Sequence, residues 1–383
     1  MALIKKNNLF LSFFNSERAG GLVLLICTIL SLFLANSSFS EEYIAIWHYH
    51  IANHAAEFWI NDGLMALFFL LIGLELEREV YIGELSKLKV ALLPIFGALG
   101  GMLIPALLYL FFNLHLPTRS GFGIPMATDI AFAIGVLSLL GNRVPLSIKI
   151  FLTALAVIDD LGAIIMIAIF YTKTIYFTNL LLSIGIFVLL LIMNRLKVKV
   201  LILYLIGGVF MWYFMLNSGV HATITGILLA FVIPFEDGKE NSISYKLQSW
   251  LHFPIAFMII PLFALCNTAI NIDKNWMQII SEPYSLGILF GLTFGKPLGI
   301  VSFIFIALKL KLTKLPKDIN WNQLIAVGFL GGIGFTMSIF ITLLAFEDKQ
   351  IINNSKLMIL IASLISGTIG YIWLKISLDK KIN

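Results

Sequence analysis

Four ionisable side chains lie near the centres of long apolar stretches: Asp129, Asp159, Asp160 and Lys296. A charged residue at the centre of a membrane helix costs roughly 2.5–3.5 kcal/mol on insertion scales. A single ion pair that holds the helices together would account for one acid and the one base. Two carboxylates would then remain without a partner in a medium of low dielectric constant. They must be neutralised by protons, by a metal cation, or by each in turn.

The chemistry of these groups favours a small hard cation. Asp159 and Asp160 point about 100° apart on a helix. One of them can face a water-filled funnel while the other meets a neighbouring helix, with Lys296 as its natural partner. Carboxylate oxygens suit Na⁺ or Li⁺, and no thiolate or histidine cluster favours a transition metal. Asp129 directly follows Thr128, and its charge can offset the positive N-terminal end of the helix that follows.

The elements that position these residues must be helices that cross a bilayer. Of the 383 residues, 60% are hydrophobic and only 12% are charged, whereas a soluble domain has about 25% charged residues. No clustered basic face remains to bind nucleic acid. A crossing helix needs about 20 mainly apolar residues. This length predicts twelve spans, over residues 20–36, 57–77, 91–112, 119–140, 147–172, 176–194, 200–216, 219–235, 250–271, 285–308, 322–345 and 352–375.

The Lys and Arg residues predict the orientation of the spans. With the N-terminus in the cytoplasm, 20 of the 26 basic residues fall in inside loops and five in outside loops, and Lys296 lies within a span. Such a bias is expected of membrane proteins, and it places both ends of the chain in the cytoplasm. Residues 1–383 are predicted to form one transmembrane domain, with 1–18 as a retained cytoplasmic surface helix and 37–56 as an extramembrane hairpin.

The fourth and eleventh spans carry helix-breaking residues near their middles. Residues 121–129 include Pro125 and two glycines, and residues 328–334 include four glycines. Proline removes a helical donor, and glycine lowers the cost of non-helical backbone. Close helix packing through small residues would explain either span alone. However, these spans are the middle members of spans 3–5 and spans 10–12, which run in opposite directions. This pattern predicts inverted three-helix repeats with two broken helices that cross at the midplane.

The sequence resembles the NhaA family of sodium/proton antiporters over essentially the whole length of the chain. Six short motifs, in order along the chain, carry this resemblance. They are Leu67–Glu75, Ala127–Gly135, Ala154–Gly162, Ser218–Gly226, Gly295–Gly299 and Gly331–Ile339.

The resemblance implies a secondary transporter, not an enzyme, that exchanges one Na⁺ or Li⁺ for two protons across a bacterial inner membrane and needs no cofactor. It assigns Asp160 as the principal carboxylate for Na⁺ and H⁺ and Asp159 as its partner. Lys296 becomes the counter-charge of Asp159. Asp129 and Thr128 belong to the crossing, where Thr128 is a candidate ligand. The resemblance also implies a homodimer that forms through a hairpin within residues 40–54.

The resemblance further implies residues that respond to pH. His221 matches a histidine linked to this response, although it also fits a polar residue at the outer end of a helix. The family carries more titratable groups at the start of the ninth span, where this chain has Tyr245, Gln248 and Ser249. Gln248 cannot titrate, so a gradual pH dependence is expected. The groups that remain there are Glu75, Glu79, Lys246 and His252.

Other classes fit the sequence less well. An intramembrane aspartyl protease also places two aspartates in lipid, but on different helices and typically within a GxGD string, which is absent. A passive cation channel would show a carboxylate ring or a carbonyl filter. The closest alternative is a sodium-coupled solute symporter on a related inverted-repeat fold, but nothing in the sequence indicates a roomy site for an organic substrate.

Overall fold

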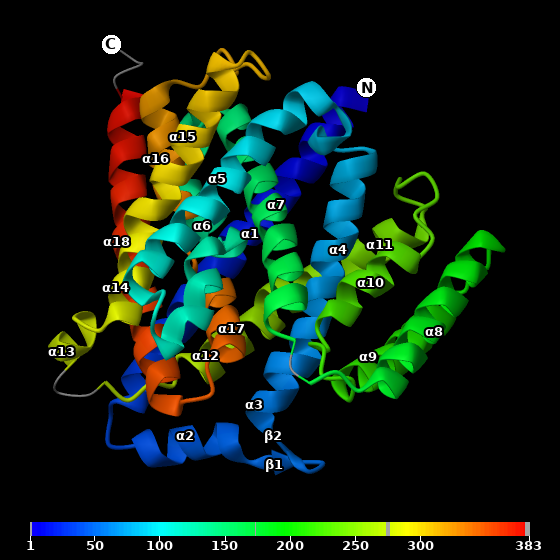
Figure 1. Cartoon of the computed structure of the whole chain (residues 1–383). Coiled ribbons are helices and arrows are strands. Elements are labelled where there is room, and N and C mark those ends of the chain that lie inside the picture. Colours follow the sequence, from blue (N-terminus) through cyan, green and yellow to red (C-terminus); the bar gives the residue numbers. More distant parts are fainter. Residues whose placement is uncertain (1, 173, 273–275, 380–383) are drawn as a thin grey trace. The chain divides into compact units, whose positions relative to one another are not determined.

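The computed structural model describes residues 2–172, 174–272 and 276–379 (Figure 1). The chain divides into two compact units. The first unit comprises Met1–Ile44, Lys87–Ala163 and Ala264–Asn383, and the second comprises Ala45–Ser86 and Ile164–Phe263. Lys173, Lys274, Lys380 and Lys381, which the orientation prediction used, lie outside the described residues.

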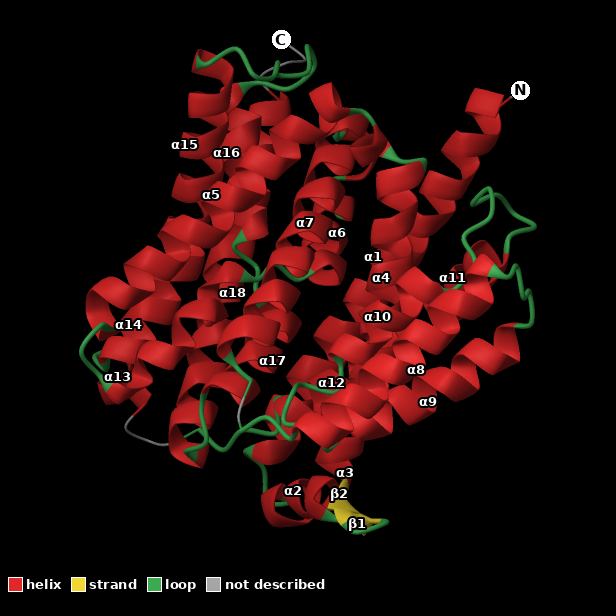
Figure 2. Ribbon diagram, turned by 45° about the vertical axis from the view of Figure 1, so that its right-hand side comes forward, coloured by secondary structure: helices red, strands yellow, loops and turns green. Residues whose placement is uncertain are grey.

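Within these described residues, nearly all the secondary structure is helical, with one small sheet (Figure 2). The first unit holds α1 (Ala2–Ala35), α5 (Leu88–Asn113), η3 (Pro117–Met126), α6 (Ile130–Ser138), η4 (Gly141–Arg143), α13 (Trp276–Ile280), α14 (Pro283–Phe290), η6 (Gly291–Gly295), α15 (Lys296–Lys309), α16 (Trp321–Gly331), α17 (Phe335–Ala345) and α18 (Lys349–Asp379). The second unit holds β1 (His50–Ile51), β2 (His54–Ala55), α3 (Ala56–Phe58), η1 (Trp59–Leu64), α4 (Met65–Tyr81), η2 (Glu84–Ser86), α8 (Phe177–Arg195), α9 (Leu201–Leu216), α10 (Ile224–Val232), α11 (Ile243–Pro254) and η5 (Ile255–Ile259). Three helices have residues in both units: α2 (Ser40–His48), α7 (Leu146–Phe170) and α12 (Ile260–Asn267).

Seven helical segments within the described residues are long and apolar enough to cross a membrane, or up to ten if each of three bent pairs counts as one span. The most apolar stretch of α8 is only 11% buried. A helix with so much apolar surface outside the protein is stable only where lipid surrounds it. The protein is therefore a multi-pass membrane protein.

Two of the predicted spans coincide with short helices. α9 has 16 residues and α10 has nine. Nine residues rise about 14 Å, about half the thickness of the hydrocarbon layer. The turn that precedes α10 contains Ser218 and Thr223, whose side chains are buried. Buried non-helical backbone of this kind is tolerated within membrane proteins, and the count of twelve spans stays a prediction.

The first unit is held by close contact between α5 and α15. A Cβ atom on Gly100 would lie 2.1 Å from the carbonyl oxygen of Gly299, and a Cβ atom on Gly299 would lie 2.1 Å from the carbonyl oxygen of Gly100. The two backbones are therefore in direct contact, which only glycine permits. The contact is reciprocal.

The segment predicted to form an extramembrane hairpin contains a helix as well as strands. Strands β1 and β2 pair antiparallel, with His50 opposite Ala55. Ala52 and Asn53 between them have φ of 48° and 69°, as the tight turn of a hairpin requires. The sequence did not predict α2, which begins at Ser40 and has two acidic residues in its first turn. Both features favour a helix N-terminus.

The N-terminal segment predicted as a surface helix is helical and continues directly into the first span. α1 runs without a break from Ala2 to Ala35, so no helix end separates residues 2–18 from the apolar part. α1 packs against α6, and a Cβ atom on Gly21 would lie 2.9 Å from the carbonyl oxygen of Ala131. The role of residues 1–18 at a membrane surface stays a prediction.

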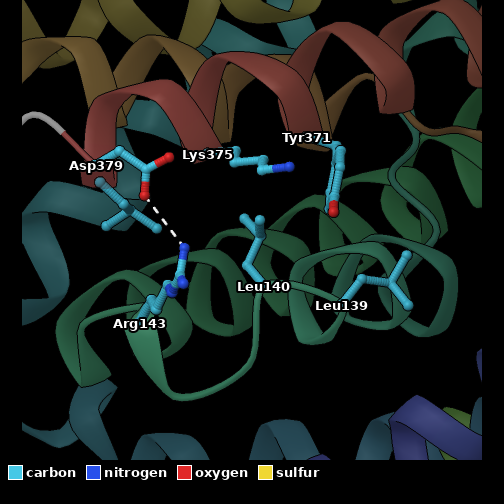
Figure 3. A pocket seen from close by; sticks show the side chains of 7 residues that line it. Leu139, Leu140, Arg143, Tyr371, Lys375 and Asp379 are labelled. Atoms are coloured by element: carbon cyan, nitrogen blue, oxygen red, sulfur yellow. Dashed lines mark hydrogen bonds and ion pairs between the residues drawn. The ribbon is translucent and has the colours of Figure 1, made fainter.

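A cavity of about 190 Å³ lies between the end of α6 and the end of α18. Figure 3 shows Leu139, Leu140 and Arg143 facing Tyr371, Lys375 and Asp379, and Leu378 also lines the cavity. Arg143 Nη1 lies 3.2 Å from Asp379 Oδ1 in an ion pair that is exposed on both sides. None of the residues predicted to bind ions lines this cavity.

Candidate functional site

Two helices of the first unit are interrupted where the sequence predicted breaks. Between η3 and α6 the chain bends by 41°, and between α16 and α17 it bends by 45°. The first break covers residues 127–129 and the second covers residues 332–334. Pro125 lies in the last turn of η3, which is a 3₁₀ helix, and Ala127 is extended with φ −79° and ψ 152°. The first break therefore follows Pro125, and the second lies within the glycine cluster of residues 328–334.

The two breaks contact each other. The backbone amide of Asp129 donates a hydrogen bond to the carbonyl of Ile333, with a distance of 2.7 Å. Thr128 Oγ1 lies 2.8 Å from the carbonyl oxygen of Gly331. Non-helical backbone at membrane depth needs such partners, because no water is present to hydrogen-bond it. Each unwound segment therefore satisfies polar groups of the other.

Asp129 accepts hydrogen bonds from the N-terminal ends of two helices. It is the N-cap of α6, where Oδ1 accepts from the amide of Phe132 at 2.9 Å. Its Oδ2 accepts from the amide of Thr336 at 3.0 Å and from Thr336 Oγ1 at 2.5 Å. Helix N-termini carry a partial positive charge. One carboxylate, only 2% exposed, thus offsets the positive ends of both α6 and α17.

Lys296 forms a buried ion pair with Asp159. Its Nζ lies 2.8 Å from Asp159 Oδ2, and both side chains are fully buried. Lys296 Nζ also donates a hydrogen bond to the carbonyl of Met126, the last residue of η3. The C-terminal end of a helix is partially negative. Lys296 therefore balances both a carboxylate and a helix end at the first break.

Glycine residues allow the backbone just before Lys296 to lie close to η3 and α5. The preceding residues 291–295 form the π-helix η6. A Cβ atom on Gly291 would lie 2.6 Å from Pro125 Cβ, and one on Gly295 would lie 3.0 Å from Pro105 Cα. Single π-turns are common at functional sites in helices. Here the glycines of η6 let its backbone approach η3 and α5.

The remaining oxygen atoms at the crossing are suited to a cation. Thr128 Oγ1 lies 2.7 Å from Asp159 Oδ2, and a hydroxyl can donate its single proton to only one acceptor at a time. Asp159 Oδ1 is buried and has no hydrogen-bond partner within the described residues. Asp160 is 1% exposed and interacts electrostatically with Lys296. Neither aspartate reaches solvent in this structure, whereas the sequence predicted that one of them could face a water-filled funnel.

The residues predicted to respond to pH belong to the second unit. Glu75 and Glu79 lie on α4, and His252 lies on α11. Gln248 of α11 hydrogen-bonds Glu75, and its Oε1 lies 3.4 Å from Arg78 Nη1.

His221, the fourth of these residues, lies in the turn before α10. Its carbonyl accepts from the amide of Ile224 at 3.2 Å. His221 thus lies at the N-terminal end of α10. The hydrogen bond between Gln248 and Glu75 joins Glu75 to α11.

Sequence reasoning missed three residues that contact the crossing of the broken helices or the start of the ninth predicted span. Thr336 binds Asp129, Ser363 of α18 binds the N-terminal end of α17, and Arg78 lies 4.9 Å from the centre of the Tyr245 ring. Thr336 lies two residues after the glycine-rich break, in the first turn of α17, and a hydroxyl group so close to a break in an apolar stretch could have identified it. Nothing local to Ser363 or Arg78 indicates a partner so far away in the sequence.

Within the parts of the chain that the structure describes, no group of three or more His, Cys, Asp and Glu side chains could hold a metal ion. Any cation at this crossing would therefore depend on two carboxylates with hydroxyl or carbonyl oxygens.

Comparisons with known proteins identify the family of this chain. The family model described as Na⁺/H⁺ antiporter 1 matches residues 11–374. The chain belongs to this family. It is 62% identical to the Na(+)/H(+) antiporter NhaA of Flavobacterium psychrophilum over 99% of both chains. It is 54% identical to the protein of the same name from Dechloromonas aromatica, over 97% of this chain and 96% of that one.

A solved structure supports the fold of this Na⁺/H⁺ antiporter 1 family member. The sodium proton antiporter MjNhaP1 from Methanocaldococcus jannaschii aligns with a TM-score of 0.55, covering 97% of this chain and 100% of the other. The two sequences are 17% identical, so this likeness concerns the fold alone.

Proposed function

We propose that this protein exchanges Na⁺ or Li⁺ for protons across a bacterial inner membrane as a secondary transporter. The observation that carries the proposal is the fully buried pair of Lys296 and Asp159, with Asp160 beside it, at the crossing of two broken helices. The names of the relatives support the same activity.

In the proposed cycle Lys296 and Na⁺ compete for the carboxylate of Asp159. The pair in the structure corresponds to the state without Na⁺, in which the ammonium occupies Oδ2. Na⁺ is bound by Asp160, the principal carboxylate, together with Asp159 and the hydroxyl of Thr128. Lys296 then moves away, because the ammonium group and Na⁺ repel each other when both contact the one carboxylate of Asp159. Protons return to the carboxyl groups of Asp159 and Asp160 on the opposite side of the membrane, and Asp129 offsets the positive ends of α6 and α17 throughout.

Exchange in reconstituted vesicles tests this function directly. Vesicles with an acidic lumen should become alkaline inside when Na⁺ is added outside, with no organic solute present. A sodium-coupled solute symporter would need a solute, and a passive channel would carry Na⁺ without any proton movement. No alkalinisation by the folded wild-type protein would overturn the proposal.

Transport is expected to be electrogenic. Two carboxyl groups that exchange two protons for one Na⁺ move net charge in every cycle, and each charge gains about 2.3 kcal/mol per 100 mV. A potassium–valinomycin potential should therefore drive Na⁺ flux with equal pH on both sides. Proteoliposomes whose Na⁺ flux does not respond to this potential would contradict the ratio of two to one.

Twelve spans with inverted repeats form part of the proposal. The reciprocal contact between Gly100 and Gly299 supports it, because α5 and α15 belong to the first members of the two predicted triplets. Residues 1–18 and the C-terminus are proposed to lie in the cytoplasm. The hairpin within residues 40–54 is proposed to join two copies of the chain as a homodimer.

The contacts around Gln248 lead to a prediction about pH dependence. Glu75, Glu79, His221 and His252 are the proposed responsive groups. Gln248 lies between Glu75 and Arg78 without titrating. Gln248→Glu adds an acidic group that is coupled to both, so more protons are linked to the transition. Activity in the natural protein should rise gradually from neutral to alkaline pH, and it should rise more steeply in the variant.

The control for this prediction is Gln248→Met, which keeps the length of the side chain without a titratable group. It should leave the steepness of the pH profile unchanged. A steep profile in the natural protein that neither Gln248→Glu nor His252→Ala alters would contradict a role for these residues.

A further inference from the structure

The helix that follows the second break has no capping side chain of its own. Gly334 is the N-cap of α17 and offers no side-chain acceptor. The first amides of a helix have no partner within the helix, and a Ser, Thr, Asp or Asn at the N-cap normally accepts from them. Water cannot take this role in the hydrocarbon layer. The acceptors must therefore come from other helices.

α18 supplies one of these acceptors. Ser363 Oγ accepts from the amide of Gly334 at 3.3 Å and from the amide of Phe335 at 3.2 Å. The next amide, that of Thr336, donates to Asp129 Oδ2 at 3.0 Å. Three successive amides at the start of α17 are thus divided between a hydroxyl group of α18 and the carboxylate of Asp129.

A second serine of α18 contacts the other side of the same break. Ser366 Oγ donates to the carbonyl of Phe329, in the last turn of α16, at 2.7 Å. A Cβ atom on Gly332 would lie 2.3 Å from Ser366 Oγ, so this contact needs the glycine. Residues three apart lie on one face of a helix. Ser363 and Ser366 therefore face both half-helices at once, and both are buried.

We propose that Ser363 and Ser366 are positioning residues. They hold the backbone on both sides of the second break in its unwound conformation and thereby set the affinity of the ion site for Na⁺. This inference rests on the proposed antiport activity. Without the Ser363 hydroxyl, the amides of Gly334 and Phe335 lose their acceptor. Asp129, which accepts from the next amide, is then the acceptor that remains at this helix end. The positive end of α17 is then less well balanced at the crossing. Na⁺ binding weakens, because a cation meets a more positive field there.

The test compares Na⁺ dependence in proteoliposomes for Ser363→Ala, Ser363→Thr and Ser377→Ala. Ser363→Ala should raise the KM for Na⁺ about three- to tenfold, the change that losing one net hydrogen bond produces. It should also move the pH profile, with the maximal rate little changed. Ser363→Thr keeps the hydroxyl and should restore the natural KM. Ser377→Ala is the same change near the C-terminal end of α18 and should behave like wild type.

Three results would overturn the inference. A natural KM and pH profile in Ser363→Ala would show that the hydroxyl does not influence the site. A Ser363→Thr variant as impaired as Ser363→Ala would show that the size of the side chain matters and the hydroxyl does not. If Ser363→Ala does not fold, Ser363→Cys takes its place, because a thiol is only a weak acceptor. A natural KM in that variant would also count against the inference.

Hydrogen exchange separates this inference from the proposed function. The amides of Gly334 and Phe335 should exchange faster in Ser363→Ala than in wild type, whether or not transport occurs. An inactive wild-type protein would overturn the antiport proposal alone. An active wild-type protein whose Ser363→Ala variant shows unchanged exchange at these amides would overturn the serine contacts alone.

Discussion

Asp160→Asn is expected to reduce Na⁺/H⁺ exchange to background while the protein remains folded. Asparagine keeps the shape of the side chain but removes both the negative charge and the site for a transported proton. Asp160 is 1% exposed, so bulk solvent does not reach the position of the lost ligand. Its charge also acts on Lys296, and its loss leaves Asp159 alone to attract Na⁺. The measurement is sodium-dependent alkalinisation of vesicles at saturating Na⁺.

Two controls make this result specific. Thermal unfolding in detergent should show that Asp160→Asn melts close to wild type, because asparagine fits the same space. Asp318→Asn changes an acid in the segment before α16, whose carboxylate accepts a hydrogen bond from Ser147, and should leave exchange largely intact. Substantial exchange by purified and reconstituted Asp160→Asn would rule out Asp160 as the principal carboxylate.

The sequence predicted the two breaks because their causes are local. Pro125 and the glycines of residues 328–334 alter the backbone at their own positions, whatever surrounds them. The buried charges were equally visible, because a charge in an apolar stretch must have a function or a partner. The residues alone made Lys296 a natural partner for one of the two adjacent aspartates, and the resemblance to the NhaA family assigned Asp159 to it.

The capping of α17 could not be predicted in this way. Gly334 indicates only that a capping side chain is missing, and the replacement comes from Ser363, 29 residues later. Periodicity shows which residues are apolar, but it does not show which helix supplies a hydrogen bond to another. The division of Asp129 between two helix ends was hidden for the same reason. Only half of its role, at α6, was visible in the sequence.

Lys296→Ala is expected to destabilise the protein more than loss of the whole ion pair. Breaking a buried pair by removing one partner typically costs about 3–5 kcal/mol, because the other charge remains buried and uncompensated. Here both side chains are fully buried, and the variant also leaves the carbonyl of Met126 without its charged donor. Replacing both partners with neutral polar residues, as in Asp159→Asn/Lys296→Gln, removes the uncompensated charge. Its melting temperature should therefore be higher than that of Lys296→Ala.

Lys296→Gln is the matched comparison, since it differs from the double variant only at position 159. If the buried carboxylate of Asp159 is the cause of the instability, adding Asp159→Asn to Lys296→Gln should raise the melting temperature. Asparagine at this position can still accept a hydrogen bond from Thr128, which lies 2.7 Å from Oδ2. Equal melting temperatures for Lys296→Gln and the double variant would mean that Asp159 carries no charge in need of compensation. Na⁺ would then not have to displace Lys296 in order to bind, and the proposed competition at Asp159 would be wrong.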